Sequence, residues 1–393
     1  MTDRPLVFLI AGEPSGDRLG GRLMARLRRK TGENIAFAGI GGDQMVAEGL
    51  EPLFPMAELS VMGIAEILPG LPRLLRRIDQ TVGEVARRHP DVLITIDAPD
   101  FCFRVAKKAH RLGIPCIHYA APSVWVWRAG RARKIARFLD HLLALLPFEP
   151  PYFERVGLPC TFVGHPAIEG GVGKGDGGGF RARHALAPDR KVIAMLPGSR
   201  KGEIERLLPV FIETMRRVQA GRPPLTVAVP TVPHIAALVK GVLAGSGLET
   251  VFVDSEPEKF DAFAASEAAL AKSGTVTLEL ALSSVPAIVA YRVNAISYAI
   301  AIRLANFKYA ALPNLVLDRP LIPEFLQDEC RAEPMAAALA KLLDDPTARA
   351  EQIAGAQTIR KLLSGPTGLP SEAAADVVLK MLEVADQRLL IAT

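Results

Sequence analysis

The sequence predicts an α/β protein built from two doubly wound, Rossmann-like domains. Short apolar runs that end in glycine or polar turns alternate with amphipathic stretches along both halves of the chain, as parallel strands joined by crossover helices do. The chain has 393 residues, which is more than one hydrophobic core usually serves. A glycine-rich cluster without hydrophobic period separates the two series. We therefore expect domains over residues 1–169 and 181–364, joined by an exposed linker over 170–180.

The expected strands are the apolar runs of each half. In the first domain these are residues 6–12, 35–40, 91–97, 116–122 and 141–147, and in the second 192–196, 225–229, 250–254, 268–274 and 287–291. A last helical segment begins at Pro370 and carries an apolar stripe that includes Val378 and Leu382. Such a stripe must be buried, so we expect residues 365–393 to pack back onto the first domain.

The composition narrows the class of protein. Hydrophobic residues make up 49% of the chain and charged residues 23%, which predicts a folded protein rather than a disordered one. The four cysteines have no CxxC spacing, so neither a disulfide framework nor a zinc site is indicated, and a reducing cytoplasm fits. The net charge of +5 favours an anionic partner. Because no nucleic-acid-binding motif accompanies it, we expect no nucleic acid partner.

The amino terminus gives no sign of export. Its apolar run is too short to span a bilayer and ends in a polar glycine turn, where a signal peptide would need a cleavage site. We expect a cytoplasmic protein.

The first motif that carries chemistry is AGEPSGD, residues 11–17, which follows the first strand and opens a helix. In open parallel sheets ligands bind beyond the carboxyl ends of the strands. Its two glycines permit a tight turn and close backbone approach to a ligand, with Glu13 and Ser15 as candidate site residues. The spacing is not GxGxxG, which argues against a nicotinamide or flavin site. Alternatively, the segment is only a strand-to-helix turn capped by Ser15 or Asp17.

The second motif places Asp97 and Asp100 at the end of the strand 91–97. One acid could serve as a general base while the other caps the following helix, or both could be caps. Asp97 is the better base because it ends the strand itself, whereas Asp100 follows a proline at a natural capping position. Glu13, after the neighbouring strand, is the next candidate for the base.

The third motif, residues 118–128, contains both tryptophans of the chain. Ser123, Trp125 and Arg128 are candidate substrate contacts, since aromatic faces suit sugar rings or acyl chains and arginine suits phosphate. Core tryptophans followed by a solvated basic helix are the alternative. His118 lies inside an apolar strand, where a hydrogen-bonded core histidine is the commoner outcome, and it remains a second-choice base.

The fourth motif, LPGSRKGE, follows the first strand of the second domain. Gly198 and Ser199 can offer backbone N–H groups, and Arg200 presents a planar fork that could stabilise a departing diphosphate. A surface arginine without a ligand is the alternative.

The fifth motif, SGTVTLE, follows the strand 268–274 and opens a helix. Amides at Ser273, Gly274 and Thr275 could hold a diphosphate at the positive end of the helix. Glu279 lies one turn along the same face as Thr275, where it could accept hydrogen bonds from ribose hydroxyls. A plain helix start with a solvent-exposed glutamate is the alternative. Neither domain shows a DxD pair, so we expect no metal and no other cofactor.

With these motifs, the chain resembles the lipid-A-disaccharide synthase family over nearly its whole length. The segments that carry the resemblance are AGEPSGD, GIGGDQMVAEG (39–49), ELSVMGIAEIL (58–68), IDAPDF, HYAAPSVWVWR, LPFEPPYF (146–153), FVGHP (162–166), LPGSR, SGTVTLE and YAALPNLVLDRPLIPEFLQDEC (309–330). The resemblance implies a GT-B fold, in which the two domains face one another across a cleft, and a Gram-negative source.

The resemblance also implies an activity. The family catalyses an inverting, metal-independent transfer from UDP-2,3-diacylglucosamine to 2,3-diacylglucosamine 1-phosphate, which gives a β-1,6-linked disaccharide and UDP. Its proposed catalytic acid corresponds to Asp97, and its donor-site loops correspond to residues 198–200 and 273–279. Asn314, inside the segment 309–330, is a further candidate substrate contact, and a homodimer is possible.

Acylated substrates reside in a membrane, so we expect peripheral association with the anionic inner face of the inner membrane. The candidate surface is the segment 61–78, where Leu68, Leu71, Leu75 and Ile78 can form an apolar stripe and Arg73, Arg76 and Arg77 can meet headgroups. An ordinary amphipathic core helix is the alternative.

Two other functions fit the motifs. One is a different GT-B enzyme that acts on UDP-N-acetylglucosamine, such as a peptidoglycan glycosyltransferase or a 2-epimerase. The other is a non-catalytic protein that binds a nucleotide sugar or a membrane. Release of UDP from mixed donor and acceptor separates the catalytic from the non-catalytic reading.

Overall fold

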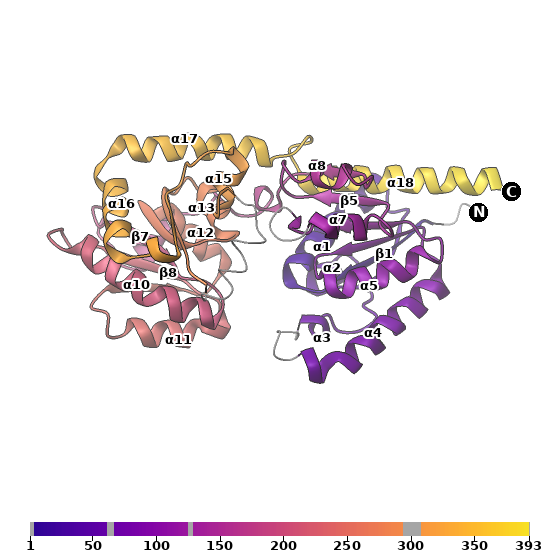
Figure 1. The fold of residues 1–393 in the computed structure, drawn as a ribbon, viewed down its shortest axis with the longest axis horizontal. Coiled ribbons are helices and arrows are strands. Elements are labelled where there is room, and N and C mark those ends of the chain that lie inside the picture. The colour runs from indigo at the N-terminus through magenta and orange to yellow at the C-terminus, as the bar shows by residue number, and fades with distance from the viewer. Residues whose placement is uncertain (1–3, 61–66, 125–128, 294–307, 393) are drawn as a thin grey trace. The chain divides into compact units, whose positions relative to one another are not determined.

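The computed structural model describes residues 4–60, 67–124, 129–293 and 308–392 and divides into two compact units (Figure 1). The first unit comprises Met1–Pro166 together with Leu363–Thr393, and the second comprises Ala167–Leu362. Each unit contains one six-stranded sheet in which every strand pair is parallel.

The first unit alternates strands and helices. In chain order its elements are β1 (Leu6–Ala11), α1 (Pro14–Lys30), β2 (Ala36–Ile40), α2 (Asp43–Ala47), α3 (Ala57–Ser60), α4 (Ile67–Arg88), β3 (Val92–Ile96), α5 (Pro99–His110), β4 (Cys116–Tyr119), α7 (Ala129–Ile135), β5 (His141–Ala144), α8 (Pro150–Glu154), β6 (Cys160–Phe162) and α18 (Pro370–Ala392). All five residues of β3 are buried, which is typical of a parallel strand covered on both faces.

The order of strands in the first sheet is β2-β1-β3-β4-β5-β6. The chain runs from β1 outward to β2 and then returns to the other side of β1 to form β3. The winding direction therefore reverses between β1 and β3, and the carboxyl ends of these two strands are where such sheets bind ligands.

Helices cover both faces of the first sheet. One face carries a core formed with α4, α5 and α7, and the other carries a core formed with α1 and α18. In the second core, Ala374 and Val378 of α18 are fully buried together with Leu23 and Leu27 of α1. The last helix of the chain thus completes the hydrophobic core of the first unit.

The second unit repeats the pattern. Its elements are α9 (Gly177–Arg183), β7 (Val192–Leu196), α10 (Lys201–Gln219), β8 (Thr226–Pro230), α11 (Pro233–Leu243), β9 (Glu249–Val253), α12 (Glu256–Ala265), β10 (Ala268–Lys272), α13 (Val276–Leu282), β11 (Ala287–Tyr291), α15 (Leu312–Leu317), β12 (Glu324–Leu326), a 3₁₀ turn at Gln327–Glu329, α16 (Ala332–Asp344) and α17 (Pro346–Leu363); a further 3₁₀ turn, Pro166–Ile168, begins at the unit boundary. The strand order is β12-β11-β10-β7-β8-β9, so the winding reverses between β7 and β10.

The glycine-rich segment differs from the exposed linker that we expected over 170–180. A Cβ atom built on Gly175 would lie 2.0 Å from the carbonyl oxygen of Phe260, and one built on Gly177 would lie 2.6 Å from that of Ala264. Residues from Gly177 onward form α9, and Phe180 is fully buried. The glycines allow this backbone to pack directly on α12, so they serve close approach rather than flexibility.

No helix in the described ranges is both long enough and apolar enough to cross a membrane.

Candidate functional site

The first candidate site lies at the β1–β3 switch point. Asp97 directly follows β3, and Ser15 stands in the first turn of α1 after β1. The hydroxyl of Ser15 donates a hydrogen bond of 3.0 Å to Oδ2 of Asp97. The first two sequence motifs are therefore brought together, and a half-buried carboxylate lies beside an exposed serine at the ligand-binding edge of the sheet.

The backbone around Asp97 is held in an uncommon conformation. Asp97 has φ 55° and Ala98 has φ 40°, in the left-handed region where each such residue other than glycine costs about 1–3 kcal/mol. The amide of Asp97 donates to the carbonyl of Tyr119 over 3.1 Å, and Oδ1 of Asp97 accepts from the amide of Ala98 over 3.1 Å. A Cβ atom on Gly12 would lie 2.5 Å from Cβ of Ala98. Glycine at position 12 is thus what allows the two loops to touch.

Asp17 has a structural role that the sequence did not reveal. Its carboxylate accepts hydrogen bonds from the amides of Gly42 (2.7 Å), Gln44 (3.0 Å) and Met45 (3.1 Å). These donors lie at the start of α2, so Asp17 caps a neighbouring helix and not its own. The side chain is only 5% exposed, and the last acid of AGEPSGD therefore fixes the loop after β2.

The other two candidate acids of the first unit are exposed. Glu13 occupies the N-cap position of α1 without a side-chain cap hydrogen bond. Asp100 lies in the first turn of α5, where its charge favours the positive end of the helix. Asp97, by contrast, directly follows a buried strand, and the hydroxyl of Ser15 and the amide of Ala98 both contact its carboxylate.

His118 does not fit the role of a base. The residue is 1% exposed, and its Nδ1 lies 2.8 Å from the hydroxyl of Thr95. Burial, reinforced by the positive charge of Arg131, lowers the pKa of His118 to about 3. His118 is therefore a neutral core histidine, packed at 4.6 Å between ring centroids against the edge of Phe103.

The remaining candidates of the third motif are only partly described. Ser123 is exposed after β4. Trp125 and Arg128 lie outside the described residues.

The second candidate site lies at the β7–β10 switch point. Gly198 has φ 126°, and a Cβ atom there would lie 2.6 Å from Oε2 of Glu203. That oxygen accepts from the amides of Ser199 (3.1 Å) and Arg200 (3.4 Å), while Lys272 at the end of β10 contacts Oε1 of Glu203 over 3.0 Å. Glu203 therefore ties the loop after β7 to the end of β10.

Several charges act on Glu203. Burial by itself would raise the pKa of this carboxyl, but the hydrogen bond and charge of Lys272, the amide of Ser199 and the charge of Arg200 outweigh it and lower the pKa. Arg200 is exposed, and no carboxylate of the described residues forms an ion pair with its guanidinium. It remains available to an anionic ligand at this edge.

The loop after β10 is more constrained than expected. The hydroxyl of Ser273 donates to the carbonyl of Ala310 over 2.6 Å, so this side chain also has a structural role. Gly274 and Thr275 complete the turn into α13. Glu279 is half-buried and forms an ion pair of 2.9 Å through Oε2 with Lys259. The ion pair orients the carboxylate that we expected to meet ribose hydroxyls.

The side chain of Asn314, a further candidate substrate contact, is engaged within the second unit. It is fully buried; its Nδ2 donates to the carbonyl of Ile322 and to Glu324, and its Oδ1 accepts from the amide of Ile322, each over 2.8 Å. Glu324 also accepts from the amides of Ala310 and Ala311. The two polar side chains thus hold the loop before α15 in place, a role that sequence reasoning missed for Glu324.

The membrane surface expected over 61–78 is also changed by the structure. Residues 61–66 lie outside the described residues, as do the side chains of Leu68 and Leu71. Ile78 is 2% exposed and belongs to the core, whereas Leu75 is exposed. Arg77 pairs with Glu58 over 2.5 Å and lies 4.4 Å from the centre of the Phe54 ring. Ile78 and Arg77 therefore stabilise the first unit, whereas Arg73 and Arg76 are exposed, as the expected surface requires.

Among the residues that the structure describes, no three His, Cys, Asp or Glu side chains converge as a metal site would require.

Sequence comparison identifies the family. A family model described as lipid-A-disaccharide synthetase matches residues 7–377. The lipid-A-disaccharide synthase of Rhodospirillum centenum is 53% identical over 379 residues, which cover 96% of this chain and 94% of that protein. The corresponding synthase of Paramagnetospirillum magneticum is 49% identical, over 95% of this chain and 97% of that one.

Solved structures agree on the fold. The UDP-GlcNAc 2-epimerase from Neisseria meningitidis bound to UDP-GlcNAc aligns with a TM-score of 0.65 at 12% identity, over 95% of this chain and 99% of that one. A putative UDP-N-acetylglucosamine 2-epimerase from Listeria monocytogenes aligns with a TM-score of 0.63 at 13% identity, over 98% of both chains. These matches confirm the predicted GT-B fold of two doubly wound domains. The sequence matches by themselves establish that the chain belongs to the lipid-A-disaccharide synthetase family.

Proposed function

We propose that the chain is a hexosyltransferase that makes the lipid A disaccharide. It transfers 2,3-diacylglucosamine from UDP-2,3-diacylglucosamine to the 6-hydroxyl of 2,3-diacylglucosamine 1-phosphate and releases UDP. The observation that carries the proposal is a carboxylate at a sheet switch point, Asp97, held by Ser15 over 3.0 Å, in a chain of this family.

Asp97 is the general base of the proposed reaction. It takes the proton from the acceptor's 6-hydroxyl as that oxygen forms its bond to the donor's anomeric carbon, from the face opposite UDP. The bond from the anomeric carbon to the diphosphate breaks, and UDP leaves with the electron pair. A positioned base of this kind contributes roughly 100- to 10,000-fold to the rate. The hydrogen bond from Ser15 orients the carboxylate for this step.

The loops at the β7–β10 switch point hold the donor in our proposal. Arg200 and the backbone of Gly198 and Ser199 stabilise the charge that develops on the diphosphate. The turn 273–275 contributes further donors, and Glu279 accepts from the ribose hydroxyls. Supporting this arrangement, the guanidinium of Arg200 is exposed and Glu279 is oriented by Lys259.

We further propose that the enzyme works at the cytoplasmic face of the inner membrane, because both substrates carry acyl chains that hold them in a bilayer. Mass spectrometry of the product tests the function directly. UDP-diacylglucosamine mixed with the monophosphate acceptor should yield one tetraacyl disaccharide 1-phosphate and one UDP per turnover. If neither forms, the proposal is wrong.

A 2-epimerase is the second candidate, because proteins of that name share the fold. The same assay separates the two functions. Conversion of UDP-N-acetylglucosamine without any acceptor would favour an epimerase, whereas dependence of UDP release on the acylated acceptor favours the transferase.

A further inference from the structure

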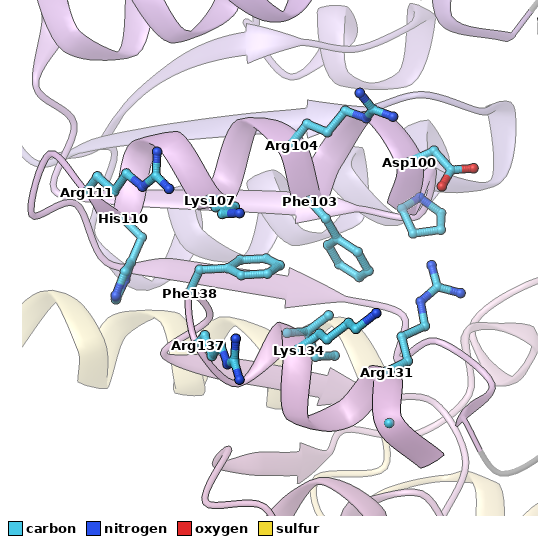
Figure 2. Close-up of a pocket in the computed structure, with 13 residues that line it drawn as sticks. Asp100, Phe103, Arg104, Lys107, His110, Arg111, Arg131, Lys134, Arg137 and Phe138 are labelled. Atoms are coloured by element: carbon cyan, nitrogen blue, oxygen red, sulfur yellow. The ribbon is translucent and has the colours of Figure 1, made fainter. Parts of the chain in front are cut away.

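A groove of about 860 Å³ lies between α5 and α7 of the first unit (Figure 2). Its floor is aromatic and aliphatic. Phe103 is half-buried, and its ring centre lies 5.9 Å from that of Phe138 at an angle of 63°. Ile135 and Phe138 are buried beneath the groove. The groove thus combines an apolar floor with walls formed by two helices.

The walls of the groove are strongly basic. One wall, on α5 and its carboxyl end, and the opposite wall, on α7 and the turn after it, each contribute three cations: Arg104, Lys107 and Arg111, and Arg131, Lys134 and Arg137. Asp100 is the one carboxylate among the lining residues. None of the six cations forms an ion pair with a carboxylate of the described residues.

Some cations outside the groove do have carboxylate partners. On the same helix, outside the groove, Lys108 pairs with Asp79 over 2.6 Å. On α4, Arg87 and Arg88 both contact Glu84. Surfaces generally mix charges of both signs, and a single-sign field of this kind attracts a ligand of opposite charge. The charge of the walls favours an anionic ligand, and the apolar floor favours one that is partly apolar.

The number of cations in the groove indicates whether it binds a single phosphate group or the surface of an anionic bilayer. A phosphate monoester carries about 1.5 to 2 negative charges near neutral pH, which two or three cations satisfy. From Arg104 to Arg111 the helix rises roughly 10 Å, so six cations spread over this length exceed what one phosphate can contact. Several headgroups of an anionic bilayer match both the charge and the spread, and apolar side chains flanked by Lys and Arg suit the membrane interface.

We propose that the groove between α5 and α7 docks the first unit onto a bilayer, with the phosphates of anionic phospholipids between its two rows of cations and Phe103 at the interface. The inference deepens the proposed function and rests on it, because a membrane-borne acceptor is what makes docking useful. It assigns membrane contact to this groove, whereas Arg77 and Ile78 of the segment 61–78 are held within the first unit.

The test is partition between buffer and vesicles. The double variant Lys107→Gln with Lys134→Gln removes one cation from each wall. The matched control, Arg29→Gln with Lys380→Gln, removes two exposed cations from α1 and α18 on the other face of the same sheet. One basic residue near an anionic membrane contributes about fivefold to partition. We therefore expect the groove variant to bind phosphatidylglycerol-containing vesicles about 30-fold more weakly, and the control to bind like the wild type.

Vesicles of phosphatidylcholine alone should bind neither form. Equal losses in the groove variant and the control would show that net charge attracts the protein, and would overturn the inference. Unchanged binding of the groove variant would overturn it as well.

Turnover separates docking from substrate binding. With a short-chain acceptor that is soluble in water, the groove variant should keep the wild-type KM and kcat, and it should lose turnover only when the acceptor is embedded in vesicles. A raised KM for the soluble acceptor would instead make the groove the acceptor's phosphate site. If the wild type released no UDP with either acceptor, the proposed function would fail, while vesicle partition would still decide the role of the groove.

Discussion

The hydroxyl of Ser15 donates to Oδ2 of Asp97 over 3.0 Å and thereby links two loops that are 82 residues apart in the sequence. The bond is possible because β1 and β3 are paired neighbours and Gly12 leaves room for Ala98. It occupies one oxygen of the carboxylate, and the amide of Ala98 contacts the other. The orientation of the proposed base is thus set by the sheet and by a single serine.

Replacing this base should abolish most of the activity. Asp97→Asn keeps the size of the side chain but cannot accept the proton, so we expect turnover to fall by at least about 100-fold. UDP affinity measured by calorimetry and the thermal unfolding temperature should remain near wild type. Ser15→Ala acts only through orientation, and we expect kcat to fall about tenfold with KM unchanged.

Glu13→Gln and Asp100→Asn are the controls for this assignment, and both should retain most of the turnover. The base would have to be reassigned if Asp97→Asn kept more than about a tenth of the wild-type rate while one of these controls abolished it.

Donor binding should depend on Glu279. Glu279→Ala removes the acceptor for the ribose hydroxyls, so UDP should bind more weakly by roughly 1–3 kcal/mol while acceptor affinity stays near wild type. Lys259→Met is the companion variant, because Lys259 orients Glu279 over 2.9 Å. It should weaken UDP binding less than Glu279→Ala does. Titration calorimetry measures both, and UDP affinity equal to wild type in Glu279→Ala would remove this residue from the donor site.

Turnover should not require a divalent cation. The sequence has no DxD pair at an expected strand end, and Arg200 can meet the charge of the diphosphate. Excess EDTA should therefore leave the rate of UDP release intact. A large loss that magnesium restores would show that a metal shares this task.

Asp17 should matter for stability and not for chemistry. Asp17 is 5% exposed and accepts three hydrogen bonds at the start of α2. Asp17→Asn turns part of the carboxylate into a donor that faces amide donors. We expect a loss of roughly 1–3 kcal/mol in the stability of the first unit, read as a lower unfolding temperature. Asp43→Asn removes an exposed acid from the first turn of α2 and should have a much smaller effect. Equal effects would argue against the buried cap.

Acid should destabilise the protein partly through His118. Its folded pKa is lowered to about 3 from the ordinary value of 6.5, so the unfolded chain binds this proton first. The free energy of unfolding therefore falls as the pH drops from about 6.5 toward 3, and none of this contribution is lost near pH 7. Urea midpoints between pH 7 and pH 4.5 should fall less steeply in His118→Gln than in the wild type. Parallel slopes would show that His118 does not titrate this way.

Much of the fold could be predicted because parallel strands that are buried on both faces consist of consecutive apolar residues. The ten expected runs all contain strands, namely β1 to β5 and β7 to β11. The two missed strands, Cys160–Phe162 and Glu324–Leu326, are three residues long and lie at sheet edges. Such short edge strands bury too little to leave a hydrophobic pattern. The prediction of an exposed linker over 170–180 was wrong because a glycine in the sequence can serve either flexibility or close packing, and the sequence does not distinguish the two.

The site was predictable where a motif follows a strand, but the roles of individual residues were not. Asn314 and His118 are polar residues within candidate site segments, yet their partners are core atoms that no local pattern reveals. Asp17 caps a helix that begins 26 residues later in the sequence. Long-range partners of this kind depend on the order in which the strands pair in the sheet. Packing across the whole unit sets that strand order.

The position of α18 has a consequence for how the protein is synthesised. The first unit is discontinuous, since its final piece begins at Leu363. During synthesis, all strands of the second unit are made before α18. At that stage the face of α1 that bears Leu23 and Leu27 is not yet covered by α18. Domains usually fold in the order of their synthesis. Here the first unit can complete its hydrophobic core only after the second unit has been synthesised. Until α18 has been synthesised, this apolar face of α1 stays uncovered.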